Sequence, residues 1–531
     1  MPSKSTTLAT LVAVLALSSD FVQAAPKPSP TKPKRQTYSK TLDITNKLVS
    51  PDGFERLAVV AGGSLPGPLL TTKKGDNFKI KVVDKLTEAG MLKTTSVHWH
   101  GLFQRGTAWA DGTGMVTQCP IASGHDFTYE FSAGEHTNTF WYHSHHELQY
   151  CDGLRGGIVI YDDQDPHKGL YDVDDASTVI TLMDWYHDFM PVVGPFQVAD
   201  STLINGKGRF VGGPSVPLSI INVECSKRYR IRLISLSCDA NFQFSIDGHT
   251  DLTVIETDGI NTKPVKAESL TIYAGQRYSF VLNANQPKGN YWVRALPNHG
   301  PQGYENGVNM AILRYKGAPT TDPTSVQTVK KKALVSSALA PLVNPAAPGI
   351  PELGKADVNI RLEVGVNMET GLFNMNGVPY TSPSVPVLLQ VLSGAASALD
   401  LMPSGSVYVL PKDKVVEITL VSLDALAPHP FHLHGHTFSV IKGPEDTVPN
   451  FVNPPRRDVY NAGGGNQTTV IRFVTNNAGP WMFHCHVEHH AVHGMSVIFV
   501  EEASAIVGQK PPPAAFNDLC PIYNALPPSE L

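Results

Sequence analysis

Near its C-terminus the chain reads GPWMFHCHVEHHAVHGM, a stretch from Gly479 to Met495 in which histidines surround a single cysteine. Successive side chains of a β-strand point to opposite faces, so His484 and His486 would project to one side and Cys485 to the other. Thiolate and imidazole groups are ligands of redox-active transition metals. The stretch therefore predicts two metal sites on opposite sides of one strand.

The cysteine face predicts a blue copper centre. His429, Cys485 and His490 supply two imidazoles and a thiolate, and Met495 follows as a distant axial thioether. Two imidazoles and a soft thiolate in a trigonal plane suit copper that cycles between Cu(I) and Cu(II). Structural zinc is the alternative, but such sites normally use short Cys-x2–4-Cys pairs, which the sequence lacks.

Four His-x-His pairs predict a larger metal cluster on the histidine face. A single buried histidine is more often a hydrogen-bonded core residue than a ligand. Four pairs in two repeats make that explanation poor, because FWYHSH and WMFHCH share one pattern and HWHG and HLHG lie upstream of them. Eight imidazoles from four strands suit two or three borderline metal ions. The pairs are His98/His100, His143/His145, His432/His434 and His484/His486.

The repeat also predicts how the domains divide the chemistry. The earlier copy carries Ser144, Gln149 and Leu154 where the later copy carries its cysteine, its third histidine and its methionine. A third, weaker copy, GNYWVRA, has the strand but none of the histidines. Three β-sandwich domains are therefore predicted, with the metal chemistry shared between the first and the third.

The elements that must position these residues are predicted to be strands. Charged residues make up only 17% of the 531-residue chain, and 44 glycines and 42 prolines supply turns. Apolar and polar residues alternate in FKIKVVDKL, YRIRLISL, YSFVLNAN and KVVEITLVSL, while long amphipathic helical runs are hard to find. The fold class is therefore predicted to be all-β.

The N-terminus has the pattern of targeting and processing segments. Residues 1–25 combine Lys4, an apolar run and the small-residue pattern Val22-Gln23-Ala24, as a secretory signal peptide does. Residues 26–35 are rich in Pro and Lys and end in a dibasic pair before Gln36. This second segment is interpreted as a cleaved pro-segment, with an uncleaved linker as the alternative.

Charge and hydropathy exclude several kinds of partner. Without residues 1–35 the chain has 37 basic and 46 acidic residues, a net charge of −9 that argues against nucleic acid or an anionic membrane. No later apolar run reaches the ~18 residues of a membrane span, and the C-terminal segment has no hydrophobic anchor. We therefore expect a secreted, extracellular monomer that binds neither nucleic acid nor a membrane.

The motifs together resemble the multicopper oxidases, and within them the fungal laccases of basidiomycete type. HWHGLFQRGTAWADGTGMVTQCPI, TFWYHSHHELQYCDGLRGGIVIYD, HPFHLHGH and PWMFHCHVEHHAVHGM resemble the copper motifs of that family in order. The likeness covers essentially the whole mature chain. It implies three consecutive cupredoxin-like domains, which are Greek-key β-sandwiches, at residues 36–165, 166–320 and 321–531, the second of them without copper.

The resemblance also implies four copper ions. An electron from a small donor would pass from type 1 copper through Cys485 to the other three ions, where four electrons reduce O2 to two waters. His146, His489 and His493 have no ligand role in the family and are expected at the surface or behind the ligands. The implied ligands are His429, Cys485, His490 and axial Met495 for type 1 copper, His98 and His432 for type 2, and His100, His143, His145, His434, His484 and His486 for the type 3 pair.

By the same resemblance, Asp200, Asn298, His299 and His490 would line the substrate pocket. Asp200 matches an acid that would hydrogen-bond a phenol OH and accept its proton; a turn-capping aspartate is the alternative. His299 stands where a pocket Phe is common, so the pocket would be more polar. Asp111 matches an acid near type 2 copper that would help to deliver protons, with an Asp-Gly β-turn as its alternative.

Covalent modifications are also implied. Cys225 is expected to be a buried free thiol, and Asn466, in the only Asn-x-Ser/Thr sequon, is a glycosylation acceptor. A secreted setting favours disulfides among the other cysteines. The family pattern pairs Cys119 with Cys520 and Cys151 with Cys238.

The function that the resemblance favours is a laccase-type oxidation of phenolic or aromatic donors coupled to O2 reduction, in lignin or phenol turnover or in pigment formation. Met495 suggests an ascorbate-oxidase-like specificity as one alternative, because fungal laccases usually carry Leu or Phe there. A ferroxidase that receives Fe(II) at Asp200 and nearby carboxylates is another. From a different class, a copper-binding electron-transfer protein would not reduce O2, but a carrier does not need eight cluster histidines.

Overall fold

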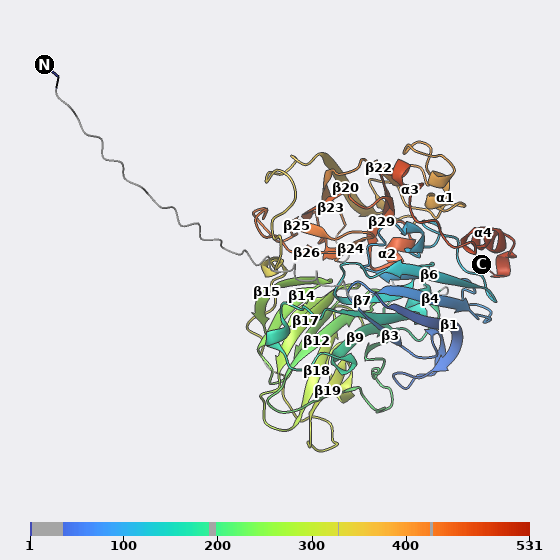
Figure 1. Cartoon of the computed structure of the whole chain (residues 1–531). Helices are drawn as coiled ribbons and strands as arrows, with labels where there is room; N and C mark the ends of the chain where they lie inside the picture. Colours follow the sequence, from blue (N-terminus) through green and yellow to red (C-terminus); the bar gives the residue numbers. More distant parts are fainter. Residues whose placement is uncertain (3–34, 191–197, 328, 425–427, 531) are drawn as a thin grey trace. The chain divides into compact units, whose positions relative to one another are not determined.

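The computed structural model describes residues 1–2, 35–190, 198–327, 329–424 and 428–530 (Figure 1). The expected signal peptide and almost all of the expected pro-segment lie outside these ranges. Residues 36–531 form one structural unit. Within the described residues, no helix has the length and apolar character that a membrane crossing requires.

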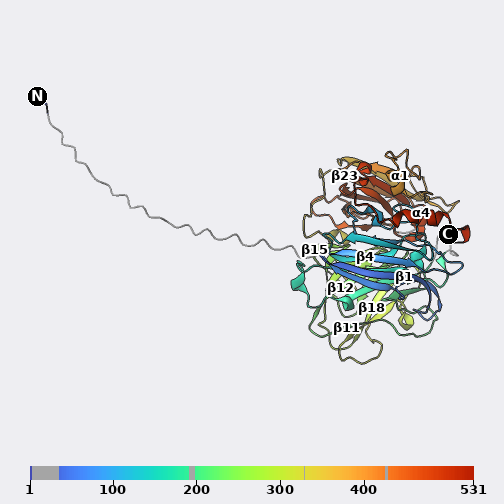
Figure 2. The ribbon, with the colours of Figure 1, turned by 45° about the vertical axis from the view of Figure 1, so that its right-hand side comes forward.

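Residues 37–161 form the first pair of sheets. In the Asn77–Asp84 strand, Phe78, Ile80 and Val82 are buried, as the alternation in the sequence predicts. One sheet has the order β2-β1-β4-β6 and the other β3-β8-β7-β5, and β1 and β4 run side by side in Figure 2. The strands are β1 (Thr37–Val49), β2 (Arg56–Ala61), β3 (Gly67–Lys73), β4 (Asn77–Asp84), β5 (Val97–His100), β6 (Asp126–Ser132), β7 (Asn138–Ser144) and β8 (Arg155–Tyr161).

Residues 179–315 form the second pair of sheets. Their orders are β10-β9-β12-β17-β14-β15 and β11-β19-β18-β13-β16. The strand expected in the weak third repeat, GNYWVRA, is β18. The strands are β9 (Val179–Trp185), β10 (Ser201–Ile204), β11 (Ile220–Val223), β12 (Arg228–Ser235), β13 (Phe242–Ile246), β14 (Leu252–Thr257), β15 (Ile260–Ala267), β16 (Leu270–Ile272), β17 (Arg277–Asn283), β18 (Asn290–Pro297) and β19 (Met310–Tyr315).

Residues 358–501 form the third pair of sheets, ordered β21-β20-β23-β28-β25-β26 and β22-β30-β29-β24-β27. The strands are β20 (Val358–Val366), β21 (Phe373–Met375), β22 (Val407–Leu410), β23 (Val415–Ser422), β24 (Pro430–Leu433), β25 (Phe438–Lys442), β26 (Arg456–Arg457), β27 (Val459–Asn461), β28 (Thr468–Val474), β29 (Gly479–Cys485) and β30 (Ser496–Glu501). Four short α-helices accompany them: α1 (Val387–Leu392), α2 (Glu488–Val492), α3 (Ala503–Ile506) and α4 (Phe516–Asn524). The predicted all-β class with three consecutive cupredoxin-like sandwiches is confirmed.

Strand register places the His-x-His pairs. β5 pairs antiparallel with β7 so that His98 lies opposite His143, and β24 pairs antiparallel with β29 so that His432 lies opposite His484. Every residue of β7 and β29 is buried. The first and third sandwiches also share one apolar core, in which Trp99 belongs to the same cluster as Met482. The four histidine-bearing strands are therefore held rigidly from both sandwiches.

Candidate metal centre and substrate pocket

Two imidazoles and the only buried free thiol of the described chain meet beside β29. The Cys485 Sγ lies 3.6 Å from His490 Nδ1 and 3.9 Å from His429 Nδ1, and the two Nδ1 atoms are 3.3 Å apart. Burial raises the pKa of the Cys485 thiol and lowers that of His490. A metal ion that displaces the thiol proton would offset the cost of burying a charged thiolate, because only the thiolate is a good ligand.

Neighbouring residues fix the orientation of this trio. His429 Nε2 lies 3.0 Å from a carboxylate oxygen of Asp424, which leaves Nδ1 free to face the sulfur. Phe373 packs against the ring of His490, with 4.2 Å between centroids. Sequence reasoning missed both partners, because neither belongs to a motif. Met495 is fully buried in the same apolar cluster as Cys485, and its carbonyl accepts the Cys485 N–H at 3.1 Å.

The eight histidines of the four pairs converge in one buried region. Three-residue groups drawn from them, such as His98, His100 and His143, hold ring nitrogens within 4.8 Å of one another. His484 and His434 bring Nε2 atoms to 3.2 Å. Burial, reinforced by neighbouring imidazoles, lowers the pKa of most of these rings, so that they are neutral and able to coordinate. The rings with a strongly lowered pKa are His100, His143, His145, His432, His434 and His486.

Unpaired ring nitrogens show that the region fits metal ions. The Nδ1 atoms of His98, His143 and His432 each donate to a backbone carbonyl at 2.8 to 2.9 Å. Their Nε2 atoms, and that of His145, are buried and have no hydrogen-bond partner. Buried polar groups are rarely left unpaired in proteins. Four lone pairs aimed into one region are what a cluster of metal ions requires.

Two carboxylates flank the cluster. Asp111 accepts from His434 Nδ1 at 2.9 Å and from the hydroxyl of Thr113 at 2.7 Å, which places this predicted residue beside the imidazoles. Asp458 lies 3.3 Å from His100 Nε2, and burial raises its pKa. Arg277 makes two 2.6 Å contacts with Asp458 and opposes that rise.

The middle sandwich also touches the cluster, although it supplies none of the eight histidines. Arg277 begins β17, and Gly275 precedes it in the left-handed region with φ +79°. A Cβ at Gly275 would lie 2.9 Å from the His486 ring and 3.1 Å from the His100 ring. Only glycine allows the backbone this close approach.

A cavity of about 270 Å3 is lined by His145 of the cluster. His146, Met482 and Glu488 line it as well. Burial raises the pKa of Glu488 well above its ordinary value, because a buried carboxylate loses its hydration. The cavity therefore gives small molecules a way to approach the histidines.

The predicted pocket residues are partly brought together. Asp200 precedes β10 with its side chain 44% exposed, and the loop bearing His299 adjoins it, since a Cβ at Gly300 would lie 3.2 Å from the Ala199 carbonyl. His299 is close enough to His490 to affect the pKa of that residue. No hydrogen bond within the described ranges joins Asp200 to His490.

Asp239 is an acid beside His299 that the sequence did not reveal. It lies 3.2 Å from His299 Nε2, and this contact raises the pKa of His299. Asn298 has a structural task, because its side-chain oxygen accepts the N–H of Asn241 at 2.9 Å. Polar side chains therefore gather around His299 and Asn298.

Several other expectations can be compared with the structure. Cys225 is free, but it is exposed and not buried, because it lies in a turn between β11 and β12. His146 and His489, which were expected at the surface or behind the ligands, are buried; His146 Nε2 lies 2.8 Å from the Thr94 hydroxyl. Asn466 is exposed. The disulfides are Cys119–Cys520 and Cys151–Cys238, the pairs that the resemblance implied.

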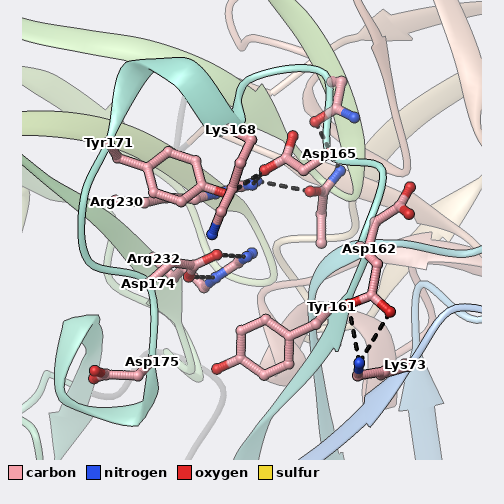
Figure 3. A pocket seen from close by; sticks show the side chains of 13 residues that line it. Lys73, Tyr161, Asp162, Asp165, Lys168, Tyr171, Asp174, Asp175, Arg230 and Arg232 are labelled. Atoms are coloured by element: carbon pink, nitrogen blue, oxygen red, sulfur yellow. Dashed lines mark hydrogen bonds and ion pairs between the residues drawn. The ribbon is translucent and has the colours of Figure 1, made fainter.

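A larger cavity, of about 430 Å3, lies where β12 meets the ends of β3 and β8 (Figure 3). Several of its charges are paired: Arg232 pairs with Asp174 at 2.7 Å, and Lys73 pairs with Asp163 at 2.9 Å. None of the predicted site residues is among its described lining residues. This cavity lies where the first and middle sandwiches meet.

Comparison with known proteins agrees with this geometry. Three family models, each described as multicopper oxidase, match residues 43–165, 176–318 and 380–505. Laccase-2 of Pleurotus ostreatus is 54% identical over 91% of this chain and 92% of its own length. Laccase-4 of Trametes villosa is 52% identical over 92% and 94%. The crystal structure of the laccase from Botrytis aclada is 31% identical, covers 94% of each chain and superposes with a TM-score of 0.82.

These relatives favour one of the functions that the sequence left open. The ferroxidase, ascorbate-oxidase and electron-transfer alternatives are not favoured, because curated relatives above 50% identity are laccases. The family and these relatives imply four copper ions, of types 1, 2 and 3, and the histidine groups fit them. The chain therefore belongs to the multicopper oxidases, as an oxidoreductase of laccase type.

Proposed function

We propose that the chain is a secreted laccase that oxidises small phenolic or aromatic donors and reduces O2 to water. Bound copper supplies the one-electron transfer from the donor and the four-electron reduction of O2. The observation that carries the proposal is the set of unpaired Nε2 atoms beside a thiolate–imidazole trio, joined through Cys485 and its neighbours in β29.

Each metal would have its own ligands. His98 and His432, whose Nδ1 atoms donate to the Asp111 and Asp458 carbonyls, would hold type 2 copper. The trio would hold type 1 copper, with Met495 as its axial neighbour. The two type 3 ions would be held by His100, His143 and His486, and by His145, His434 and His484.

The chain's own residues would orient ligands and move protons. Asp111 holds His434 in one tautomer and is placed to transfer a proton to the cluster. Asp200 would accept a hydrogen bond from a phenol OH and then its proton. Asn298 and His299 would shape the pocket wall beside His490, and the cavity at His145 would admit O2 and release water.

The cellular setting belongs to the same proposal. Residues 1–25 would direct secretion, residues 26–35 would be removed, and the sandwiches would occupy residues 36–165, 166–320 and 321–531. Asn466 would carry a glycan on an exposed loop. The mature protein would act as a monomer in extracellular phenol or lignin turnover.

O2 uptake by the copper-loaded mature protein tests this function. A methoxyphenol and Fe(II) are offered separately at matched concentrations, and uptake should be faster with the phenol. Faster uptake with Fe(II) would favour a ferroxidase. No uptake with either donor would leave only electron transfer.

A further inference from the structure

His187 lies between two carboxylates beside the pocket. Its Nε2 lies 2.9 Å from Asp52, and its Nδ1 lies 3.9 Å from Asp200. The two acids come from different places, since Asp52 lies in the β1–β2 connection and Asp200 lies just before β10. Nothing in the laccase motifs of the sequence singled out His187 or Asp52.

Asp52 fixes the tautomer of His187. The Asp52 side chain is fully buried and accepts from the Ser201 hydroxyl at 2.6 Å and from the Phe54 N–H at 3.0 Å. A carboxylate that accepts these bonds also accepts from His187, so Nε2 carries the hydrogen. In neutral His187 the Nδ1 lone pair therefore faces Asp200.

The ring and the pocket acid are both held in place. His187 stacks on Phe54 with 3.9 Å between centroids, and Phe210 meets it edge-on at 4.8 Å. The backbone N–H of His187 donates to Asp200 Oδ2 at 2.8 Å, which leaves Oδ1 towards the ring. The 3.9 Å gap would close when a substrate binds, because catalytic hydrogen bonds are often long in substrate-free structures.

We propose that His187 and Asp52 form a proton relay, which carries protons from Asp200 to the solvent. The enzyme removes one electron from a bound phenol, the O–H bond breaks, and the proton moves to Asp200. Asp200 then passes a proton to His187 Nδ1, and Asp52 stabilises the imidazolium. The ring is 15% exposed, so it can release the proton to water and restore Asp200 for the next phenol.

Few other charges of the described chain act on this relay. Arg56 lies within electrostatic range of Asp52 but is paired with Asp152 at 2.9 Å. Asp188, next in the chain, is exposed. The relay deepens the proposed role of Asp200 and rests on it, so the experiment must separate the two.

The test measures the rate at which a donor reduces the oxidised holoenzyme in a single turnover. The loss of the blue colour reports this reduction. The variants are His187→Gln, which keeps a hydrogen-bonding group but cannot take up a proton, His187→Gly, which removes the ring, and Phe210→Leu, a control that alters the packing on His187 and Phe54. The donors are a methoxyphenol and ferrocyanide, which carries no proton. Rates are measured in H2O and D2O.

We expect His187→Gln to slow the phenol about tenfold, to change its solvent isotope effect and to leave ferrocyanide within about twofold. Phe210→Leu should leave the ratio of the two donors unchanged. Added imidazole should restore the phenol rate of His187→Gly, because the ring site is open to water. Equal losses with both donors, or no loss with either, would overturn the relay.

Asp200→Asn separates the role of Asp200 as the proton acceptor from the relay through His187 and Asp52. If Asp200→Asn slows only the phenol while His187→Gln does not, the relay is wrong and the role of Asp200 stands. If Asp200→Asn leaves phenol oxidation intact, both are wrong. The laccase function itself depends on the O2-uptake experiment and not on either variant.

Discussion

Individual imidazoles of the metal centre are oriented by hydrogen-bond acceptors behind them, and two of these, at Asp424 and Asp458, lie outside the copper motifs. Backbone carbonyls accept from the Nδ1 atoms of His98, His143 and His432, while a carboxylate holds His429. Such partners fix the tautomer and the basicity of a ligand. Changes behind the ligands should therefore alter metal binding without altering the fold.

Asp424→Leu tests this at the thiolate site. Loss of the acceptor frees the His429 ring to rotate, and we expect copper affinity there to fall about 10–100-fold. Asp424→Asn is the matched control, since its amide oxygen still accepts the Nε2 hydrogen. Chelator competition, followed by the blue colour, measures both. Equal affinity in the Leu variant and the wild type would show that Asp424 does not position His429.

Met495→Leu tests the axial position. The exchange nearly conserves volume, so the fold should tolerate it, while loss of a thioether near copper should raise the type 1 reduction potential. Redox titration of the blue band gives the potential. An unchanged or lower value would place the sulfur away from the metal.

Among the elements, β12 contacts the first sandwich through a buried arginine that also forms an ion pair within the second domain. Arg232 is almost completely buried, binds Asp174 through two nitrogens and donates to the Thr139 hydroxyl of β7 at 3.0 Å. Figure 3 shows this pair in the same cavity as Lys73. The two cations differ mainly in burial, so they form a matched pair for mutation.

Arg232→Gln should destabilise the protein by about 3–5 kcal/mol, because it leaves the buried Asp174 carboxylate without its partner. Lys73→Gln should leave the urea midpoint nearly unchanged, since that pair is 62% and 73% exposed. Urea unfolding followed by fluorescence compares the two. Similar urea midpoints for both variants would contradict a structural role for the ion pair between Arg232 and Asp174.

At the scale of the whole molecule, many buried groups have shifted pKa values in the metal-free state. Lowered histidine pKa values mean that the unfolded chain binds more protons below pH ~6.5 than the folded chain does. Buried carboxyls with raised pKa values act in the opposite direction, but the histidines outnumber them. Carboxyls of this kind include Asp84, Glu147, Asp152, Asp458 and Glu488; the histidines include His100, His136, His143, His145, His146, His432, His434, His484, His486 and His490.

The metal-free protein should therefore lose stability as the pH falls from 7 to 5. Each histidine contributes up to about 1.4 kcal/mol per pH unit once the pH is below its unfolded pKa and above its folded pKa. Urea unfolding of the metal-free protein at several pH values measures the slope. A midpoint that stays constant or rises on acidification would show that these imidazoles are already protonated in the folded state.

The sequence predicted the parts of this molecule that repeat or alternate. β4, β12, β17 and β23 end within two residues of the predicted runs, and the His-x-His pairs converge as their strand periodicity implied. Contacts between distant segments left no local pattern. Arg277, for example, reaches Asp458 across 181 residues. Asp424 lies only five residues from His429, but it belongs to no motif that marks it as a partner.

Burial of isolated residues was equally hard to predict. Cys225 was expected to be buried and is exposed, while the sequence left open whether His489 lies at the surface or behind the ligands, and it is buried. Tertiary packing decides such positions, and one sequence carries little information about it. The relay of Asp52, His187 and Asp200 was hidden for the same reason.

The cluster histidines also impose an order of events on biosynthesis. His100 and His486 face each other at 3.2 Å but are 386 residues apart, and Cys119 is made 401 residues before its partner Cys520. A growing chain therefore contains four of its eight cluster histidines long before the other four exist. Copper retention at both sites would then report that synthesis has passed Met495, and a message truncated before β29 would yield a product with neither metal site.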